Sequence, residues 1–212
     1  DEALATYPRL DVLVNNVGGF WAHRHETVDG LEYTFALNHL APFLLTRLLL
    51  PRLTENGQAR VVTVSAGAQV IGRIDFDDLQ GRNGYSSQRA FNQSKLANVL
   101  FTYELARRTA GTGVTANVLH PGLTDTNFGQ EDMLLWMRLT RPLARPFMKS
   151  PEQGAQTSIY LASSPEVEGV TGRYFVGRRS KRSAARSLDE QVASRLWGVS
   201  AHLTRAPSPE PP

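Results

Sequence analysis

Three short apolar runs, separated by long segments of helical periodicity, constrain the fold of this chain most. The runs are rich in β-branched residues and hardly alternate with polar ones, which is typical of strands buried on both faces. They cover residues 11–16, 60–65 and 113–120. Between them, apolar residues recur at helical spacing over about 27–53, where Pro42 should kink the helix, and over about 89–109. Strands that alternate with helices in this way predict an α/β fold with a doubly wound parallel sheet.

The last third of the sequence predicts three smaller elements. A helix over 151–162 is indicated by Ser150, a suitable N-cap, and by Pro151, which fits the first helical turn. A short strand over 173–176 and a last helix over 188–203 follow it. These elements extend the same alternation of strand and helix to the end of the folded part.

The domain organisation is simple. The sequence has no internal repeat and no interdomain linker, so we expect a single domain over 1–203. The proline content of 204–212 predicts a disordered tail. Because the chain begins at Asp1, with neither a methionine nor a leader segment, we expect it to be the later part of a longer protein.

Composition excludes several classes of protein. With 212 residues, 41% hydrophobic and 20% charged, the chain is an ordinary globular sequence that is long enough for one substantial core. It has no cysteine, which excludes disulfides, a thiolate nucleophile and a cysteine-ligated metal, and we predict no metal site. Its longest apolar stretch is interrupted by Arg47 and is shorter than the ~20 residues that a membrane helix needs. We therefore expect a cytoplasmic protein without a transmembrane segment.

A basic segment begins with the predicted strand over 173–176 and continues beyond it. Its six cationic residues are Arg173, Arg178, Arg179, Lys181, Arg182 and Arg186. Few aromatic residues interleave these charges, and stacking aromatics are typical of surfaces that bind single-stranded nucleic acid. We therefore interpret the segment as a solvated loop and expect no nucleic-acid partner.

Small, polar and glycine-containing segments follow each of the three main predicted strands. They are "NNVGG" at 15–19, "SAGA" at 65–68 and "HPGLTDT" at 120–126. The carboxyl ends of parallel strands lie at one edge of the sheet, where such folds bind their ligands, and small residues let the backbone approach a ligand closely. The sequence therefore predicts a ligand site at this edge.

Six motifs of the chain resemble the short-chain dehydrogenase/reductase family, and most closely its retinol-dehydrogenase-like branch. In order and spacing they are "DVLVNNVG", "DGLEYTFALNHLAPFLLT", "RVVTVSAGA", "FNQSKLANVLFTYELARR", "VLHPGLTDT" and "VTGRYF". The resemblance covers about 11–197. It implies a Rossmann-like sheet that lacks its N-terminal part, and an oxidoreductase that moves a hydride between NAD(P) and a carbonyl or alcohol carbon.

The family's catalytic group consists of an Asn, a Ser, a Tyr and a Lys. By resemblance the Asn is Asn38 and the Lys is Lys95, which would hold the nicotinamide ribose and favour the tyrosinate. The Tyr position is Phe91, one helical turn before Lys95, and phenylalanine has no proton to donate. The Ser position is Ala66. Two of the four groups are therefore replaced.

Two nearby hydroxyls are candidates to replace the missing groups. Ser65 precedes Ala66, but adjacent strand residues point to opposite faces, and we expect Ser65 to bond to the backbone instead. Tyr85 lies six residues before Phe91 in a turn-rich loop and is the nearest upstream phenol. Both remain alternatives at this stage.

The resemblance implies only the later half of a cofactor site. The adenosine side would be lined by Asn15, Asn16 and Gly18. The nicotinamide and its phosphates would be approached by Lys95, Pro121, Gly122 and Thr126. The family's glycine-rich phosphate turn does not occur in the sequence. The segment "GTGVTA" at 111–116 superficially fits the dinucleotide fingerprint, but it opens a strand, whereas the fingerprint must open a helix. We therefore expect weak binding of NAD or NADP, with no readable preference between them.

The resemblance also implies partners. The segment 127–148 occupies the family's substrate lid, and its apolar residues either suit an apolar substrate or pack on the core. A homodimer is expected through the two long helices, with Leu44, Leu48, Val99, Leu100 and Tyr103 as apolar contacts. Two functions stay open: an NAD(P)-dependent oxidoreductase of impaired activity, and a non-catalytic binding or assembly protein of the same fold, that is, a pseudoenzyme.

Overall fold

A five-stranded, mainly parallel sheet organises the residues that the computed structural model describes, which are 6–55, 57–124 and 148–205. The strand order is β1-β2-β3-β4-β5, and only β5 runs antiparallel to its neighbour. The strands are β1 Val12–Asn15, β2 Ala59–Val64, β3 Val114–His120, β4 Tyr174–Val176 and β5 Arg179–Lys181. The α/β fold with a Rossmann-like parallel sheet is confirmed.

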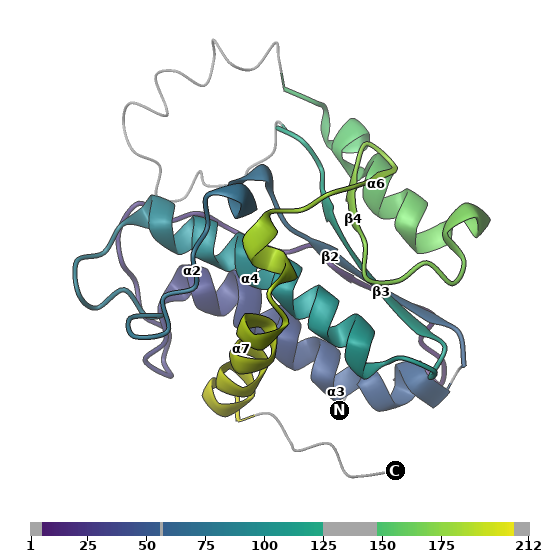
Figure 1. Ribbon diagram of the computed structural model, residues 1–212, viewed down its shortest axis with the longest axis horizontal. Coiled ribbons are helices and arrows are strands. Elements are labelled where there is room, and N and C mark those ends of the chain that lie inside the picture. The colour runs from purple at the N-terminus through teal and green to yellow at the C-terminus, as the bar shows by residue number, and fades with distance from the viewer. Residues whose placement is uncertain (1–5, 56, 125–147, 206–212) are drawn as a thin grey trace.

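Helices cover both faces of this sheet (Figure 1). The α-helices are α2 Tyr33–Phe35, α3 Ala41–Glu55, α4 Ser87–Arg108, α6 Pro151–Ser163 and α7 Glu190–Leu203. The shorter turns are the π-helical η1 Ala36–Leu40 and the 3-10 helices η2 Gly67–Val70, η4 Pro165–Val167 and η5 Ala185–Leu188. None of the described helices is long and apolar enough to cross a membrane.

The two faces of β2 and β3 are divided between different helices. Val61 and Ala116 belong to a cluster with α3, α4 and α7, whereas Val62 and Leu119 pack with Leu161 of α6. Because side chains alternate along a strand, one nearly continuous apolar run can fill both layers. This explains why the sequence of these strands shows so little polar alternation.

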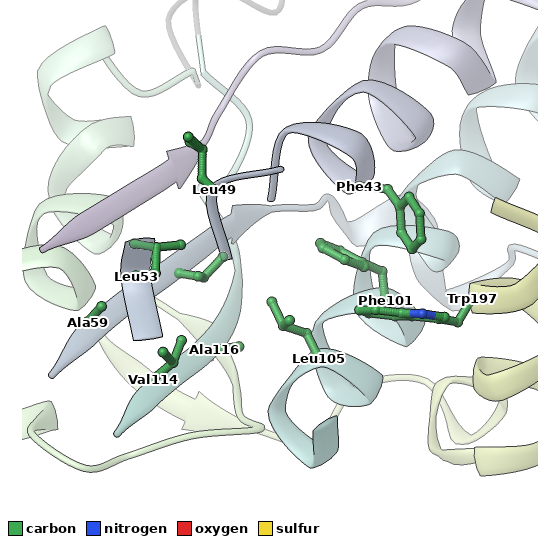
Figure 2. Packing of buried hydrophobic residues seen from close by; sticks show 10 residues of the cluster. Phe43, Leu49, Leu53, Ala59, Phe101, Leu105, Val114, Ala116 and Trp197 are labelled. Carbon is green, nitrogen blue, oxygen red and sulfur yellow. The ribbon is translucent and has the colours of Figure 1, made fainter. Parts of the chain in front are cut away.

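Three aromatic rings join α3, α4 and α7 into one layer (Figure 2). The Phe43 ring meets the edge of Phe101 at 5.6 Å and that of Trp197 at 5.0 Å, and Phe101 and Trp197 stack at 5.9 Å. All three side chains are buried. The C-terminal helix α7 therefore covers α4 and completes the core.

Burial inside the monomer changes the expected dimer contacts. Val99 and Leu100, which the sequence analysis offered as dimer contacts, are fully buried inside the monomer. Leu48 is exposed, whereas Leu44 and Tyr103 are half-buried. The expectation for Val99 and Leu100 was wrong because the pattern of α4 does not reveal its neighbours. Leu100 packs in a cluster with Ala193 and Leu196 of α7, and Val99 packs with Val118 and Tyr174 of the sheet.

The first predicted helix differs most from the structure. Residues 27–31 form a turn, in which the Gly30 amide donates to the Thr27 carbonyl, and the helix begins only at Tyr33. The kink expected at Pro42 is not found. The π-turn η1 lies just before the proline, and in it the Ala41 amide donates to the Ala36 carbonyl. Proline has no backbone N–H and cannot donate a helical hydrogen bond. Because the wider π-turn comes first, Pro42 lies in the first turn of α3.

The other boundaries agree closely with the sequence, with one omission. Ser150 caps α6 with a reciprocal bond to Gln153, as expected from the sequence. Strand β5 was missed because all three of its residues are exposed and polar, so no apolar alternation marks them. The basic segment of 178–181 is therefore a hairpin, and its turn places Arg178 at φ 63.

A buried histidine connects the π-turn to the C-terminal helix. The His39 Nε2 atom lies 2.9 Å from the Ser200 hydroxyl, and Nδ1 lies 3.3 Å from Asn98 Oδ1. Because Asn98 Oδ1 can only accept, Nδ1 carries the proton and Nε2 accepts from Ser200. Complete burial lowers the pKa of His39 from 6.5 to about 4, although its bond to Asn98 opposes the shift. His39 is therefore neutral at physiological pH.

Replacing Phe43 with alanine should destabilise the fold strongly, because it removes a fully buried ring from the aromatic layer. We expect a loss of about 3–5 kcal/mol in the free energy of unfolding. Leu45→Ala on the same helix is the matched control, since Leu45 is 45% exposed, and we expect a change of about 0.5 kcal/mol or less. Urea denaturation measures both, and equal losses would contradict this assignment of the core.

The His39 pKa predicts a specific loss of stability in acid. Since the folded pKa of about 4 lies below the ordinary 6.5, the unfolded state binds the proton more readily, and stability is lost as pH falls from 6.5 towards 4. Between pH 7 and pH 4.5 this amounts to about 2 kcal/mol. Urea denaturation at the two pH values tests this with His39→Gln. The variant should be less stable than the parent at pH 7, but between pH 7 and pH 4.5 its free energy of unfolding should fall by about 2 kcal/mol less than that of the parent. An unchanged acid sensitivity would refute the prediction.

Candidate active site

The candidate site lies where the carboxyl ends of β1, β2 and β3 meet η1 and the first half of α4. The strands β1, β2 and β3 are parallel neighbours, so Asn15, Ser65 and His120 come to one edge of the sheet. Helix α4 contacts η1, η2 and β3. Figure 1 shows how α4 crosses one face of the sheet beneath this edge. The three strand-end segments predicted to share an edge therefore do so.

Asn38 holds the loop after β1 against α4. Its side chain is fully buried in η1. The amide nitrogen donates to the Gly19 carbonyl at 2.9 Å and to the Ser94 hydroxyl at 3.0 Å, and the amide oxygen accepts from the Gly19 backbone at 2.7 Å. One side chain thus binds a loop and a helix at the same time.

Lys95 is almost fully buried beside Asn38. The side chain is 4% exposed, and burial lowers the pKa of its amine from 10.5 to about 8. A β-carbon added to Gly18 would lie 3.0 Å from Lys95 Nζ and 3.1 Å from Asn38 Oδ1. Any larger residue at position 18 would therefore crowd both groups, which accounts physically for glycine at this point.

Phe91 faces Lys95 as the sequence spacing requires. Lys95 Nζ lies 5.5 Å from the centre of the Phe91 ring, and Phe20 meets the same ring edge-on at 5.7 Å. The ring thus supplies a cation–π contact but no proton. The structure brings Asn38, Phe91 and Lys95 together, and it places an apolar wall where the resemblance implies a phenol.

The two candidate substitutes bond elsewhere. Ser65 donates to the Lys95 backbone carbonyl at 2.7 Å, which is the backbone role expected for it. Tyr85 donates to Glu32, at the start of α2, at 3.2 Å. Burial raises the pKa of the Tyr85 phenol to about 12; the contact with Thr34 opposes this shift, and the charge of Glu32 adds to it. A phenol held by a carboxylate at this pKa is a poor acid. Ala66 lies in extended backbone just before η2 and offers only a methyl group.

The expected cofactor residues lie along the same edge. Asn15 is buried, donates to Thr46 at 3.0 Å, and has no hydrogen-bond partner for its side-chain oxygen among the described residues. Asn16 is exposed. Gly122 adopts φ 97, which glycine tolerates best, and Lys149 donates to the Pro121 carbonyl at 3.0 Å. Thr126 and nearly all of the predicted lid, 127–148, lie outside the described residues.

Three further residues belong to the site but were not predicted. Ser94 is fully buried, and its hydroxyl donates to the Phe91 carbonyl at 2.8 Å while accepting from Asn38. His120 accepts weakly from the Gly122 amide at 3.4 Å, and its pKa is lowered by burial and by Lys149. Two of them had a sequence signal: Ser94 directly precedes Lys95, and His120 opens the predicted strand-end segment 120–126. Lys149 comes from a distant segment that no local pattern connects to the site.

A comparison with protein-family models matches residues 1–133 to the short chain dehydrogenase family. The chain belongs to this family. Among curated relatives, human retinol dehydrogenase 14 is 49% identical over 94% of this chain, and human retinol dehydrogenase 13 is 43% identical over 95% of it. The retinol-dehydrogenase-like resemblance is therefore confirmed. The chain spans only 60% and 62% of these two relatives.

Solved structures agree with this assignment. An uncharacterised protein from Mycobacterium paratuberculosis superposes with a TM-score of 0.76 at 34% identity, over 99% of this chain and 72% of that one. A protein from Beutenbergia cavernae, described as an NAD(P)-dependent gluconate 5-dehydrogenase with bound NADP, reaches 0.58 at 25% identity, over 82% and 66% of the two chains. The fold of the described residues is thus that of nicotinamide-dependent family members.

Proposed function

We propose that this chain carries the carboxyl-terminal part of an NAD(P)-dependent oxidoreductase site for an apolar carbonyl or alcohol, with impaired proton transfer. The observation that carries the proposal is the cluster of Asn38, Lys95 and Phe91 around Gly18 at the carboxyl edge of the sheet. Membership of the short-chain dehydrogenase family supports hydride transfer as the reaction class. The retinol dehydrogenases among the relatives support an apolar substrate.

The residues of this edge fit the nicotinamide side of the cofactor and part of its adenosine side. Lys95 presents a buried amine beside Gly18, whose missing side chain is what a closely approaching ligand requires. Asn15 has a buried oxygen that lacks a donor among the described residues. We propose that Lys95 binds the ribose hydroxyls and that the 121–122 backbone lies against the nicotinamide. The bound cofactor would supply the hydride.

Proton transfer is where this chain departs from the family pattern. Reduction of a carbonyl produces an alkoxide that needs a proton, and the ring of Phe91 has none to give. The Ala66 methyl group cannot donate a hydrogen bond to the substrate oxygen either. We propose that hydride transfer is consequently slow or absent, because the developing charge has neither an acid nor a positioned donor.

The second candidate function is a non-catalytic binding or assembly protein, and it rests on Phe91 and Ala66 in place of the family's Tyr and Ser. Phe20 and Phe91 make an apolar wall beside Lys95 that is well packed in its own right. A cytoplasmic location and a homodimer remain our expectations. Because Val99 and Leu100 are buried inside the monomer, the dimer would have to use the exposed side of α3, where Leu45 and Leu48 lie.

Weak cofactor binding is the first expected outcome. The sequence lacks the glycine-rich turn that binds the pyrophosphate, whereas the ribose side is present. We expect dissociation constants for NADH and NADPH above about 100 µM, or less than ~5.5 kcal/mol of binding free energy. Calorimetric titration of the chain with each cofactor measures them. A low-micromolar constant for either cofactor would contradict the prediction.

Restoring the two missing groups should restore turnover only as a pair. We expect no measurable reduction of retinal or small aldehydes by the chain itself. Loss of a general acid costs about 10²–10⁴-fold and loss of one oxyanion donor about 10²–10³-fold, and the two act together. Phe91→Tyr with Ala66→Ser is therefore tested in a chimera that carries the glycine-rich strand and turn of a retinol dehydrogenase ahead of Asp1.

The two single variants in the same chimera are the controls, and NADPH oxidation is followed at 340 nm, the usual wavelength for this cofactor. Turnover by the double variant but by neither single variant supports the proposed roles. Robust turnover by the unmodified chain that disappears in Tyr85→Phe would contradict them, because it would make Tyr85 the acid.

A further inference from the structure

Lys95 stands apart from the other lysines of this protein. The chain contains only three lysines, Lys95, Lys149 and Lys181. Lys181 is exposed on β5, and Lys149 is half-buried and donates to the Pro121 carbonyl. Lys95 is the only one in the core, and it forms no ion pair with any residue that the structure describes. A buried amine without a counterion is the usual setting of a nucleophilic lysine.

Burial favours the neutral form of the Lys95 amine, and the apolar side chains beside it favour an apolar ligand. The ring of Phe91 lies over the amine, and Phe20 packs against that ring. No hydroxyl at position 91 shares a proton with the amine, because phenylalanine replaces the expected tyrosine. On another side the amine meets Gly18, which has no side chain to cover it. The amine thus has the Phe91 ring on one side and the bare backbone of Gly18 on another, with the Asn38 amide group close to that glycine.

We propose that Lys95 captures apolar aldehydes covalently as a Schiff base. The lone pair of the neutral amine attacks the aldehyde carbon, and a C–N bond forms while the carbonyl oxygen becomes a hydroxyl group. One proton of the amine moves to that oxygen to make the hydroxyl group. The hydroxyl then leaves as water with the second proton of the amine, and a C=N bond forms. The step needs no oxidant, reductant or cofactor. The Phe20 and Phe91 rings would receive the apolar chain of the aldehyde.

The amount of neutral amine decides whether this reaction is feasible near neutral pH. With a pKa of about 8, roughly a quarter of the Lys95 amine is neutral at pH 7.5, against about a thousandth at the ordinary value of 10.5. Burial therefore compensates for restricted access by raising the reactive fraction more than a hundredfold. The reaction should increase with pH and reach half of its maximal rate near pH 8.

Capture goes beyond the proposed oxidoreductase function, and only the class of aldehyde rests on it. Hydride transfer needs the nicotinamide, whereas imine formation is measured without any cofactor. The NADPH oxidation assay therefore reports the proposed function, and a covalent-labelling assay reports capture. Either can fail while the other succeeds.

The test incubates the full chain with decanal and sodium cyanoborohydride, which reduces an imine to a stable secondary amine but hardly reduces the free aldehyde. Intact mass and peptide mapping then locate the decyl group. Among the three lysines, we expect only Lys95 to carry a decyl group at pH 7.5 to 8. In chain unfolded in urea the three lysines should react alike, because the preference depends on the folded environment.

Three variants make the assignment specific. Lys95→Arg keeps the charge but should lose the decyl group, whereas Lys149→Arg and Lys181→Arg are matched controls that should label like the parent. Circular dichroism checks that each variant folds. If Lys95→Arg misfolds, peptide mapping of the parent chain still decides. Labelling of Lys149, Lys181 and the amino terminus with Lys95 unmodified at pH 8 would overturn the proposal.

Discussion

The hydrogen bonds of the Asn38 side chain determine how the candidate site is assembled. They join three segments that are far apart in sequence: the loop after β1, the π-turn and α4. An amide can do this because it offers two donors and an acceptor in one plane. The π-turn matters for the same reason, since its wider backbone precedes Pro42 and carries Asn38 at the point where it meets Gly19. Lys95, Gly18 and Phe91 then occupy positions relative to this fixed group.

The chemistry of the site follows from burial more than from partners. Lys95 loses water without gaining a carboxylate among the described residues, and its pKa falls. A tyrosine at position 91 would share a proton with this amine. Phenylalanine leaves the amine facing an aromatic quadrupole instead. One ring without a hydroxyl thus turns a proton-relay arrangement into an isolated nucleophile in an apolar setting.

Most of the fold and the position of the site could be predicted from the sequence. Nearly continuous apolar runs indicated strands buried on both faces, and the i, i+4 spacing of Phe91 and Lys95 placed them on one side of a helix. The late start of the first helix could not be predicted, because the capping role of Glu32 depends on the fold and its side chain also accepts from Tyr85. Strand β5 has no apolar pattern. Local patterns could not reveal that α7 buries Leu100 and that the sheet buries Val99, since elements distant in sequence meet only in the folded chain.

The bond between His39 and Ser200 gives the C-terminal helix a role in the site that its position would not suggest. His39 is the immediate neighbour of Asn38 in the π-turn, and Ser200 lies in the last turns of α7. A stop codon or a proteolytic cut ahead of Ser200 would leave the His39 imidazole without its hydroxyl partner. A cut ahead of Trp197 would also expose the face of Phe101 to water. Damage at the end of the chain would therefore reach the candidate site through the backbone that joins His39 to Asn38, without changing Asn38, Lys95 or Phe91 themselves.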